Sequence, residues 1–298
     1  MSTREEWLER VGVIRTWRRG DQRAPHKPLL LLYILGRLQR TGTTEVTYVE
    51  AEPELEALLR DFGPPNPTSP AYPFHHLQTD GLWQVEGNDA GASAVRLRDT
   101  NAVGRLEAGF EAALRDDPGL VALIGRFLLD SNFPESLHSE LGAAAGLNLE
   151  QAELVAAQAR VRELRRRDPR FREMVLVAYE FQCAMCGYDG RIGAESVGLD
   201  AAHVRWWAFD GPDTVDNALC LCSFHHKLLD RGVLGITTGR AIAVSTRFVG
   251  RGEVADQLVL KMVGRDLLLP QSGQPQPDAL HISWHRREVF RDPPRVAA

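Results

Sequence analysis

The 298-residue sequence lacks any apolar run long enough to cross a membrane. Its longest such run, LLLLYIL at residues 29–35, has the length of a buried helix segment, whereas a membrane-spanning helix needs about 20 residues. The first residues, MSTREEWLERVG, are charged from the fourth position and lack the apolar core of a secretory signal. We therefore expect a cytoplasmic protein with no membrane part.

The sequence also lacks an excess of positive charge, because its formal net charge is −5. A protein that binds nucleic acid would have to gather basic residues locally, where they neutralise phosphates. Such a segment runs from 160 to 172, in a helical pattern that Pro169 interrupts. Its arginines are Arg160, Arg162, Arg165, Arg166, Arg167, Arg170 and Arg172. They form either a solvated helix face or a strip that follows DNA phosphates, and both interpretations stay open.

Cysteine is absent outside one short region, where four cysteines fall within forty residues. Disulfides are not expected in a reducing cytosol, so this clustering favours metal binding. Cys183-x-x-Cys186 and Cys222-x-x-His225 form two knuckles, and 35 residues separate them. This spacing predicts a tetrahedral structural zinc site with three sulfur ligands and one nitrogen ligand. Cys220 lacks the gap that a knuckle needs and is interpreted as a small buried hydrophobe.

Hydrophobic periodicity predicts a mainly helical N-terminal half. The expected helices are residues 4–19, 27–40, 52–61, 102–116, 118–130 and 134–145. The proline-rich stretch 63–73 excludes regular structure, and residues 81–87 and 93–99 alternate like the two strands of a hairpin. Beyond Cys183 we expect short strands, one helix at 223–230 and a tail.

These elements define an α+β protein with three parts. Residues 1–145 form a mainly helical domain with a small β-hairpin, 146–168 form a basic helical linker, and 169–298 form a second domain.

His226 and Asp230 follow the second knuckle on one helix face, because they are four residues apart. His225 and His226 lie roughly 100° apart around a helix, so only one of them can face the zinc. His226 and Asp230 could then hold a harder divalent ion such as Mg²⁺, although such a pair by itself is more often a surface helix contact.

The residues around this pair have an ordered pattern. It consists of Ala202-His203-Val204, Asp210-Gly211, Asn217-Ala218-Leu219, Leu221-Cys222, His225-His226 and Asp230-Arg231-Gly232. With the first knuckle, this pattern spans about fifty residues and resembles the HNH (ββα-metal) nuclease motif. The resemblance implies a zinc-stapled ββα unit that hydrolyses phosphodiester bonds.

Roles can be carried over position by position from that resemblance. His203 matches the general base, His226 and Asp230 match the ligands of a catalytic Mg²⁺ or Mn²⁺ ion, and Asn217 matches the residue that braces the loop. The chain departs from the pattern at His225, where many relatives have cysteine. It also departs where many relatives have a metal ligand directly before the base, and there Asp200 could substitute from two residues further back.

Two stretches of the N-terminal half, APHKPLLLL at 24–32 and YPF..LQ.DGLW at 72–83, carry a second resemblance. Their polar residues could simply be exposed groups at helix and loop ends. In this order and spacing, however, the stretches resemble the sulfur-recognition domain of phosphorothioate-dependent, type IV (McrA-like) restriction endonucleases.

The resemblance covers most of residues 10–145 and implies a set of DNA contacts. The matching residues are Arg23, His26, Lys27, Tyr72, Pro73 and His76. The last three would form an apolar cup for sulfur, and the first three would hold the DNA backbone and nearby base edges. Arg96 or Arg98 would add a contact.

Together the resemblances imply an endonuclease that binds double-stranded phosphorothioate DNA and cuts it near the mark. Cutting both strands needs two active sites, so a homodimer is a reasonable expectation. Two alternatives stay open, namely an HNH nuclease that recognises another mark such as a methylated base, and a zinc-stabilised DNA reader that does not cut.

Overall fold

The computed structural model describes residues 4–14, 22, 24–66, 68–87, 91–148 and 170–296. It divides into two compact units, Met1–Arg162 and Glu163–Ala298. Most of the expected linker, 146–168, lies outside the described residues, as do Arg23 and the arginines from 160 to 167. Among the described helices, none combines the length and the apolarity that crossing a bilayer requires.

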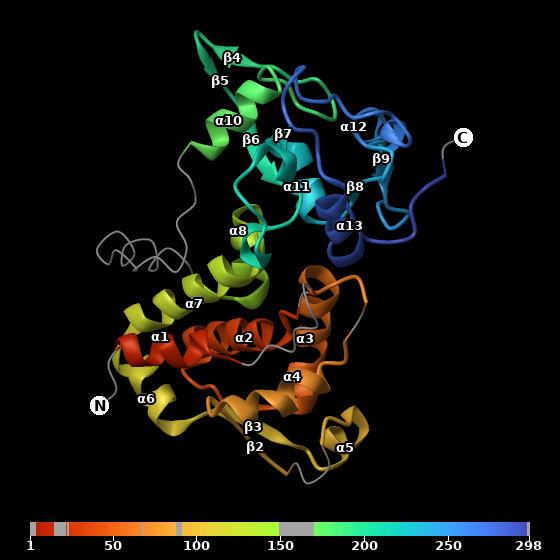
Figure 1. The fold of residues 1–298 in the computed structure, drawn as a ribbon. Coiled ribbons are helices and arrows are strands. Elements are labelled where there is room, and N and C mark those ends of the chain that lie inside the picture. The colour runs from red at the N-terminus through yellow and green to blue at the C-terminus, as the bar shows by residue number, and fades with distance from the viewer. Residues whose placement is uncertain are drawn as a thin grey trace. The chain divides into compact units, whose positions relative to one another are not determined.

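Unit 1 is built around one central helix, α2, whose side chains are buried on nearly every face. Helices α3, α4, α7 and α8 pack against it, and Figure 1 shows α7 lying beside α2. A helix that is apolar all round belongs in a core, so the leucine run of α2 explains its central place. The helices are α1 (Arg4–Gly12), α2 (His26–Thr41), α3 (Tyr48–Phe62), α4 (Ala71–His76), α5 (Ala94–Asp99), α6 (Ala108–Asp116), α7 (Pro118–Asn132) and α8 (Glu135–Ala145).

The small sheet of unit 1 differs from the expected hairpin. Strands β1 (Val46–Thr47), β3 (Val103–Leu106) and β2 (Trp83–Glu86) are antiparallel in the order β1-β3-β2. The expected strand at 93–99 was wrong, because these residues form α5. Ser93 caps that helix by accepting a hydrogen bond from the backbone N–H of Arg96, and Leu97 is its one buried side chain.

Three further expectations for unit 1 need correction. Helix α1 ends at Gly12, before Val13 and Ile14, and residues 15–19 of the expected helix 4–19 lie outside the described residues. The expected helix at 102–116 begins instead with strand β3. Helix α4 starts inside the proline-rich stretch, since Pro70 stands at its N-cap and Pro73 in its first turn, where a missing N–H leaves no hydrogen bond unmade.

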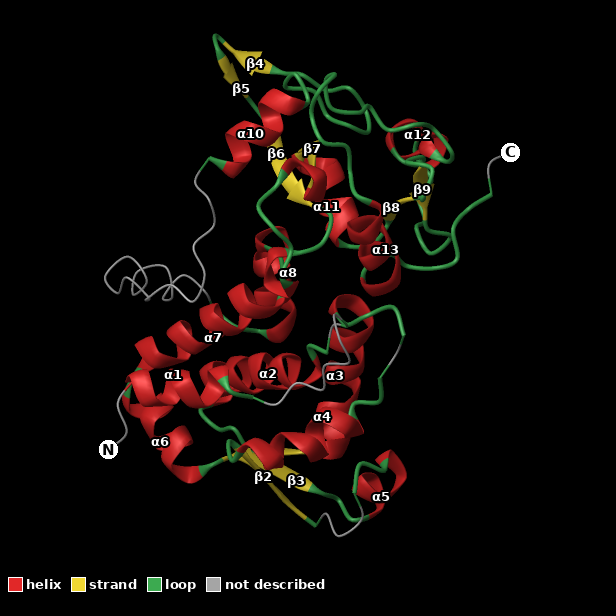
Figure 2. Ribbon diagram, viewed as in Figure 1, coloured by secondary structure: helices red, strands yellow, loops and turns green. Residues whose placement is uncertain are grey.

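Unit 2 contains the predicted strand–strand–helix arrangement. Strands β6 (Leu199–His203) and β7 (Ala218–Cys222) pair antiparallel, with Leu199 opposite Cys222 and His203 opposite Ala218. Helix α11 (Ser223–Asp230) follows β7 directly, and helix α10 (Phe171–Ala178) packs on both strands (Figure 2). The α+β class and the ββα unit are therefore confirmed.

The remainder of unit 2 is irregular chain with short elements. These are β4 (Arg191–Ile192), β5 (Glu195–Ser196), β8 (Leu234–Ile236), β9 (Ile242–Val244), α12 (Glu253–Leu258) and α13 (Ala279–Glu288), with 3₁₀ turns η2 (Trp207–Phe209), η3 (Val215–Asn217) and η4 (Leu260–Met262). The expected C-terminal tail in fact includes α13, which Asp278 caps and which buries Ile282 and Trp284. Helix α13 was not predicted because its apolar residues do not follow a regular helical period.

Candidate functional site

A Cys₃His cluster lies where the two knuckles meet in unit 2. One ligand atom from each of Cys183, Cys186, Cys222 and His225 lies within 4.8 Å of the others. His225 Nδ1 is 3.2 Å from Cys222 Sγ and 3.6 Å from Cys183 Sγ. Ligands of one tetrahedral zinc ion stand about 3.5 Å apart, so the four side chains fit that metal.

The second nitrogen of His225 fixes the orientation of its ring. Nε2 lies 2.9 Å from the carbonyl oxygen of Leu258 and donates to it, which leaves the lone pair of Nδ1 facing the thiols. Cys220 lies outside the cluster and is fully buried in β7, where burial raises the pKa of its thiol to about 12. It is the small buried hydrophobe that the sequence indicates.

His203 stands at the end of β6 in a shielded position, since its side chain is only 12% exposed. The imidazole ring stacks on Phe171 of α10, with ring centroids 4.4 Å apart and an interplanar angle of 23°. Its Nε2 lies 2.8 Å from Oδ1 of Asp213, a residue that the sequence interpretation missed.

Asn217 is fully buried and closes the loop between β6 and β7. Its Oδ1 accepts from the backbone N–H of Arg205 at 2.8 Å, and its Nδ2 donates to the carbonyls of Arg205 and Pro212 at 3.0 Å each. Only glycine fits at position 211, because a Cβ there would lie 1.9 Å from the Arg205 carbonyl oxygen. The bracing role that the HNH resemblance implies has a clear physical basis in these bonds.

His226 lies between two carboxylates. Its Nε2 is 3.2 Å from Oδ2 of the buried Asp230, and its Nδ1 is 3.7 Å from Oδ2 of Asp200. Asp200 also accepts from the Ser223 hydroxyl at 3.3 Å. Burial opposes the charged imidazole, yet the two carboxylates raise the pKa of His226 to about 10. The structure thus brings Asp200 to the pair that the sequence proposed as ligands of a divalent ion.

Three rings of unit 1 gather where α4 meets the start of α2. The ring centroids of Tyr72 and His76 are 4.4 Å apart, and those of Tyr72 and His26 are 6.1 Å apart. Pro73, between them in sequence, is buried in α4. Burial lowers the pKa of His76, and the charges of His75 and Lys27 lower it further, so the imidazole favours its neutral form.

Lys27 has a different setting from the one expected for a DNA contact. Its Nζ lies 2.6 Å from Oδ2 of Asp80 and 3.4 Å from Oγ1 of Thr79, and the side chains of the ion pair are only 8% and 3% exposed. Asp80 belongs to the quoted DGLW motif, but its pairing with Lys27, 53 residues away, could not be predicted from that motif. Arg98, a suggested further contact, forms a two-bond pair with Glu52 at 2.6 Å.

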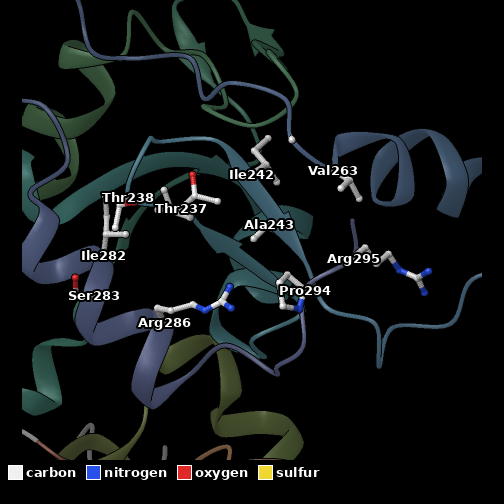
Figure 3. Close-up of a pocket in the computed structure, with 12 residues that line it drawn as sticks. Thr237, Thr238, Ile242, Ala243, Val263, Ile282, Ser283, Arg286, Pro294 and Arg295 are labelled. Carbon is white, nitrogen blue, oxygen red and sulfur yellow. The ribbon is translucent and has the colours of Figure 1, made fainter. Parts of the chain in front are cut away.

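A hollow of about 490 Å³ lies elsewhere in unit 2, beside the β8–β9 hairpin and α13 (Figure 3). Its walls include Ile236, Ile242 and Ile282, and Arg286 stands at its edge in an ion pair with Asp292. The predicted site residues do not line it.

Comparisons with known proteins identify both units. Residues 4–150 match the family described as the ScoMcrA-like DNA sulfur-binding domain, and residues 183–237 match the HNH endonuclease family. A search of curated proteins finds no match.

The similarity to solved structures is weaker. The sulfur-binding domain of SprMcrA, complexed with phosphorothioated DNA, is 24% identical, with a TM-score of 0.44 over 50% of this chain and 97% of that one. The type IV phosphorothioation-dependent restriction endonuclease ScoMcrA is 22% identical, with a TM-score of 0.39 over 51% of this chain and 35% of that one. The modification-dependent TagI restriction endonuclease is 22% identical, with a TM-score of 0.30 over 48% and 41%. The assignment rests on the family matches.

The family matches thus show a chain that joins a DNA sulfur-binding domain to an HNH endonuclease domain. Residues 4–150 lie in the N-terminal unit, and residues 183–237 contain the ββα unit, so each match falls on one unit.

Proposed function

We propose that this protein binds double-stranded DNA carrying a phosphorothioate and hydrolyses a phosphodiester bond near the mark. The observation that carries the proposal is the presence, in one chain, of a sulfur-binding family domain and an HNH unit whose His203, Asn217 and His226 lie in a complete ββα arrangement. A reader without nuclease activity would not need that arrangement.

The apolar cup that Tyr72, Pro73 and His76 would form in unit 1 suits sulfur better than oxygen. Replacing a non-bridging phosphate oxygen by sulfur gives a softer and less hydrated atom, which loses less on entering an apolar site than oxygen does. Tyr72, Pro73 and a neutral His76 would form the walls of the cup. His26 and Arg23 would contact the DNA beside it. Lys27 would act on the cup indirectly, because its charge lowers the pKa of His76 while its ammonium is paired with Asp80.

In unit 2, His203 would take a proton from a water molecule. The water oxygen then forms a bond to phosphorus, the bond from phosphorus to the leaving oxygen breaks, and that oxygen takes up a proton from solvent. His226, Asp230 and Asp200 would hold Mg²⁺ or Mn²⁺, which when bound stabilises negative charge on the phosphate. The Cys₃His cluster would hold zinc and fix the two knuckles together.

The proposal is tested with two duplexes of one sequence, one with a single phosphorothioate and one without, incubated with Mg²⁺ or Mn²⁺. We expect the ends of the products to map near the sulfur, and only in the modified duplex. The His203→Ala variant should still bind the modified duplex without cutting it. Equal cutting of both duplexes would instead favour an HNH nuclease that recognises another mark, and the absence of cutting would favour a reader.

Cutting of both strands would require a second active site, and we propose a homodimer for that step. Sedimentation of the protein on modified duplex should then show two chains per DNA. A single chain that makes double-strand breaks would rule this out.

A further inference from the structure

The proposed base, His203, contacts the carboxylate of Asp213, which lies in the loop between β6 and β7. Asp213 Oδ1 lies 2.8 Å from His203 Nε2, and the two side chains are only 13% and 12% exposed. A hydrogen bond to an ionised acceptor at this distance, shielded from water, is stronger than one between neutral groups. No family role carried over to this chain involves Asp213.

Hydrogen bonds of Asn217 fix the loop that carries Asp213 at the point where its two ends meet. Pro212, the residue before Asp213, accepts a hydrogen bond from the Asn217 side chain at 3.0 Å, and Val204 donates its backbone N–H to the Asn217 carbonyl at 2.8 Å. Gly211 has no Cβ, so its backbone can pack directly against the carbonyl oxygen of Arg205. Asn217 therefore sets the position of the backbone from which the Asp213 carboxylate reaches His203.

The ring of His203 is held on a second side as well. Phe171 stacks on one face of the imidazole, so the ring cannot turn about its long axis without losing that contact. Phe171 fixes the face of the imidazole ring, and Asp213 fixes its Nε2. These two contacts together set the direction in which the remaining nitrogen, Nδ1, points.

We propose that Asp213 is a positioning residue for His203, which it holds in the tautomer with the proton on Nε2 so that Nδ1 takes up the proton of the attacking water. The carboxylate also stabilises the imidazolium that forms when this proton arrives. The inference rests on the proposed nuclease function, because it assigns Asp213 a part in that reaction.

Asp213→Asn tests the inference because it keeps the size of the side chain and removes its charge. In the zinc-loaded full chain acting on phosphorothioate duplex, we expect kcat to fall about 100-fold, within the range that a positioned base contributes, and KM to stay within twofold. Glu195→Gln is the matched control. Glu195 is an exposed carboxylate of β5 in the same unit and lies outside the HNH pattern, so this substitution should leave kcat unchanged.

Nuclear magnetic resonance of ¹⁵N-labelled histidines gives a readout that a merely structural role would not move. The signals of His203, identified by their loss in His203→Gln, should show the proton on Nε2 in the wild type and a mixture of tautomers in Asp213→Asn. A wild-type His203 protonated on Nδ1 would overturn the inference, whatever the fate of the variant. An Asp213→Asn enzyme that is as active as the wild type, or more active, would also overturn the inference. Higher activity would mean that Asp213 slows the reaction.

The two proposals fail in different ways. If the wild type cuts neither duplex, the proposed nuclease function fails, whereas wild-type cutting with an unaffected Asp213→Asn variant removes only the role of Asp213.

Discussion

Replacing Asp80 by asparagine removes the counter-charge of a buried ammonium in unit 1. The Lys27–Asp80 pair is 2.6 Å long, and its side chains are 8% and 3% exposed, so water cannot take over from the lost carboxylate. Breaking a buried ion pair at one partner costs about 3–5 kcal/mol. A domain's whole stability is about 5–15 kcal/mol, so the loss should be large.

Hydrogen exchange read by mass spectrometry measures this change unit by unit. Peptides of α2 should exchange about 10²- to 10⁴-fold faster in Asp80→Asn, which corresponds to the same 3–5 kcal/mol in the free energy of opening. Peptides of β6 and β7 should be unchanged, because they belong to the other unit.

A matched control and a rescue sharpen the test. Glu86→Gln breaks an ion pair with Arg105 whose side chains are 65% and 43% exposed, and it should cost less than about 1 kcal/mol. The double variant Lys27→Met with Asp80→Leu should recover most of the stability, because no buried charge is left unpaired. If Asp80→Asn costs no more than Glu86→Gln, the reasoning from burial is refuted.

Three more predictions concern function. Cys186→Ser, or removal of zinc by a chelator, should unfold the knuckles and abolish cleavage. Binding of phosphorothioate duplex by unit 1 should persist in a gel-shift assay. Loss of cleavage and binding together would contradict independent units. Tyr72→Ala should bind modified and plain duplex equally, whereas Tyr72→Phe should keep the preference for sulfur; an unchanged preference in Tyr72→Ala would remove this residue from the cup. Gly211→Ala, whose Cβ would meet the Arg205 carbonyl oxygen at 1.9 Å, should lower the cleavage rate by at least tenfold without weakening DNA binding; full cleavage would show that the loop relaxes freely.

The zinc knuckles and the ββα unit could be predicted from the sequence because their chemistry is local. Cys183-x-x-Cys186 and Cys222-x-x-His225 each need only a few residues to form, and β6 and α11 lie where the pattern places them. The long apolar run of α2 was equally clear, since few other structures could bury it.

What could not be predicted depends on partners that are distant in sequence or on short segments. Residues 94–99 fit either a strand or a helix, and the Ser93 cap and the burial of Leu97 decide for the helix. Asp80 is 53 residues from Lys27, and Asp213 is ten residues from His203, so only the folded chain shows that they meet. Asp200 was offered from the sequence as a further ligand, but its distance of 3.7 Å from His226 Nδ1 is seen only in the folded chain.

The central claim is that sulfur in the DNA backbone directs the HNH unit to its target. The most direct measurement mixes equal amounts of modified and plain duplex of one sequence, with different labels, in one reaction with Mg²⁺ or Mn²⁺. The ratio of the two cleavage rates then reports discrimination alone. We expect the modified duplex to be cut at least 100-fold faster, a preference of about 2.7 kcal/mol, and a ratio near one would contradict the account.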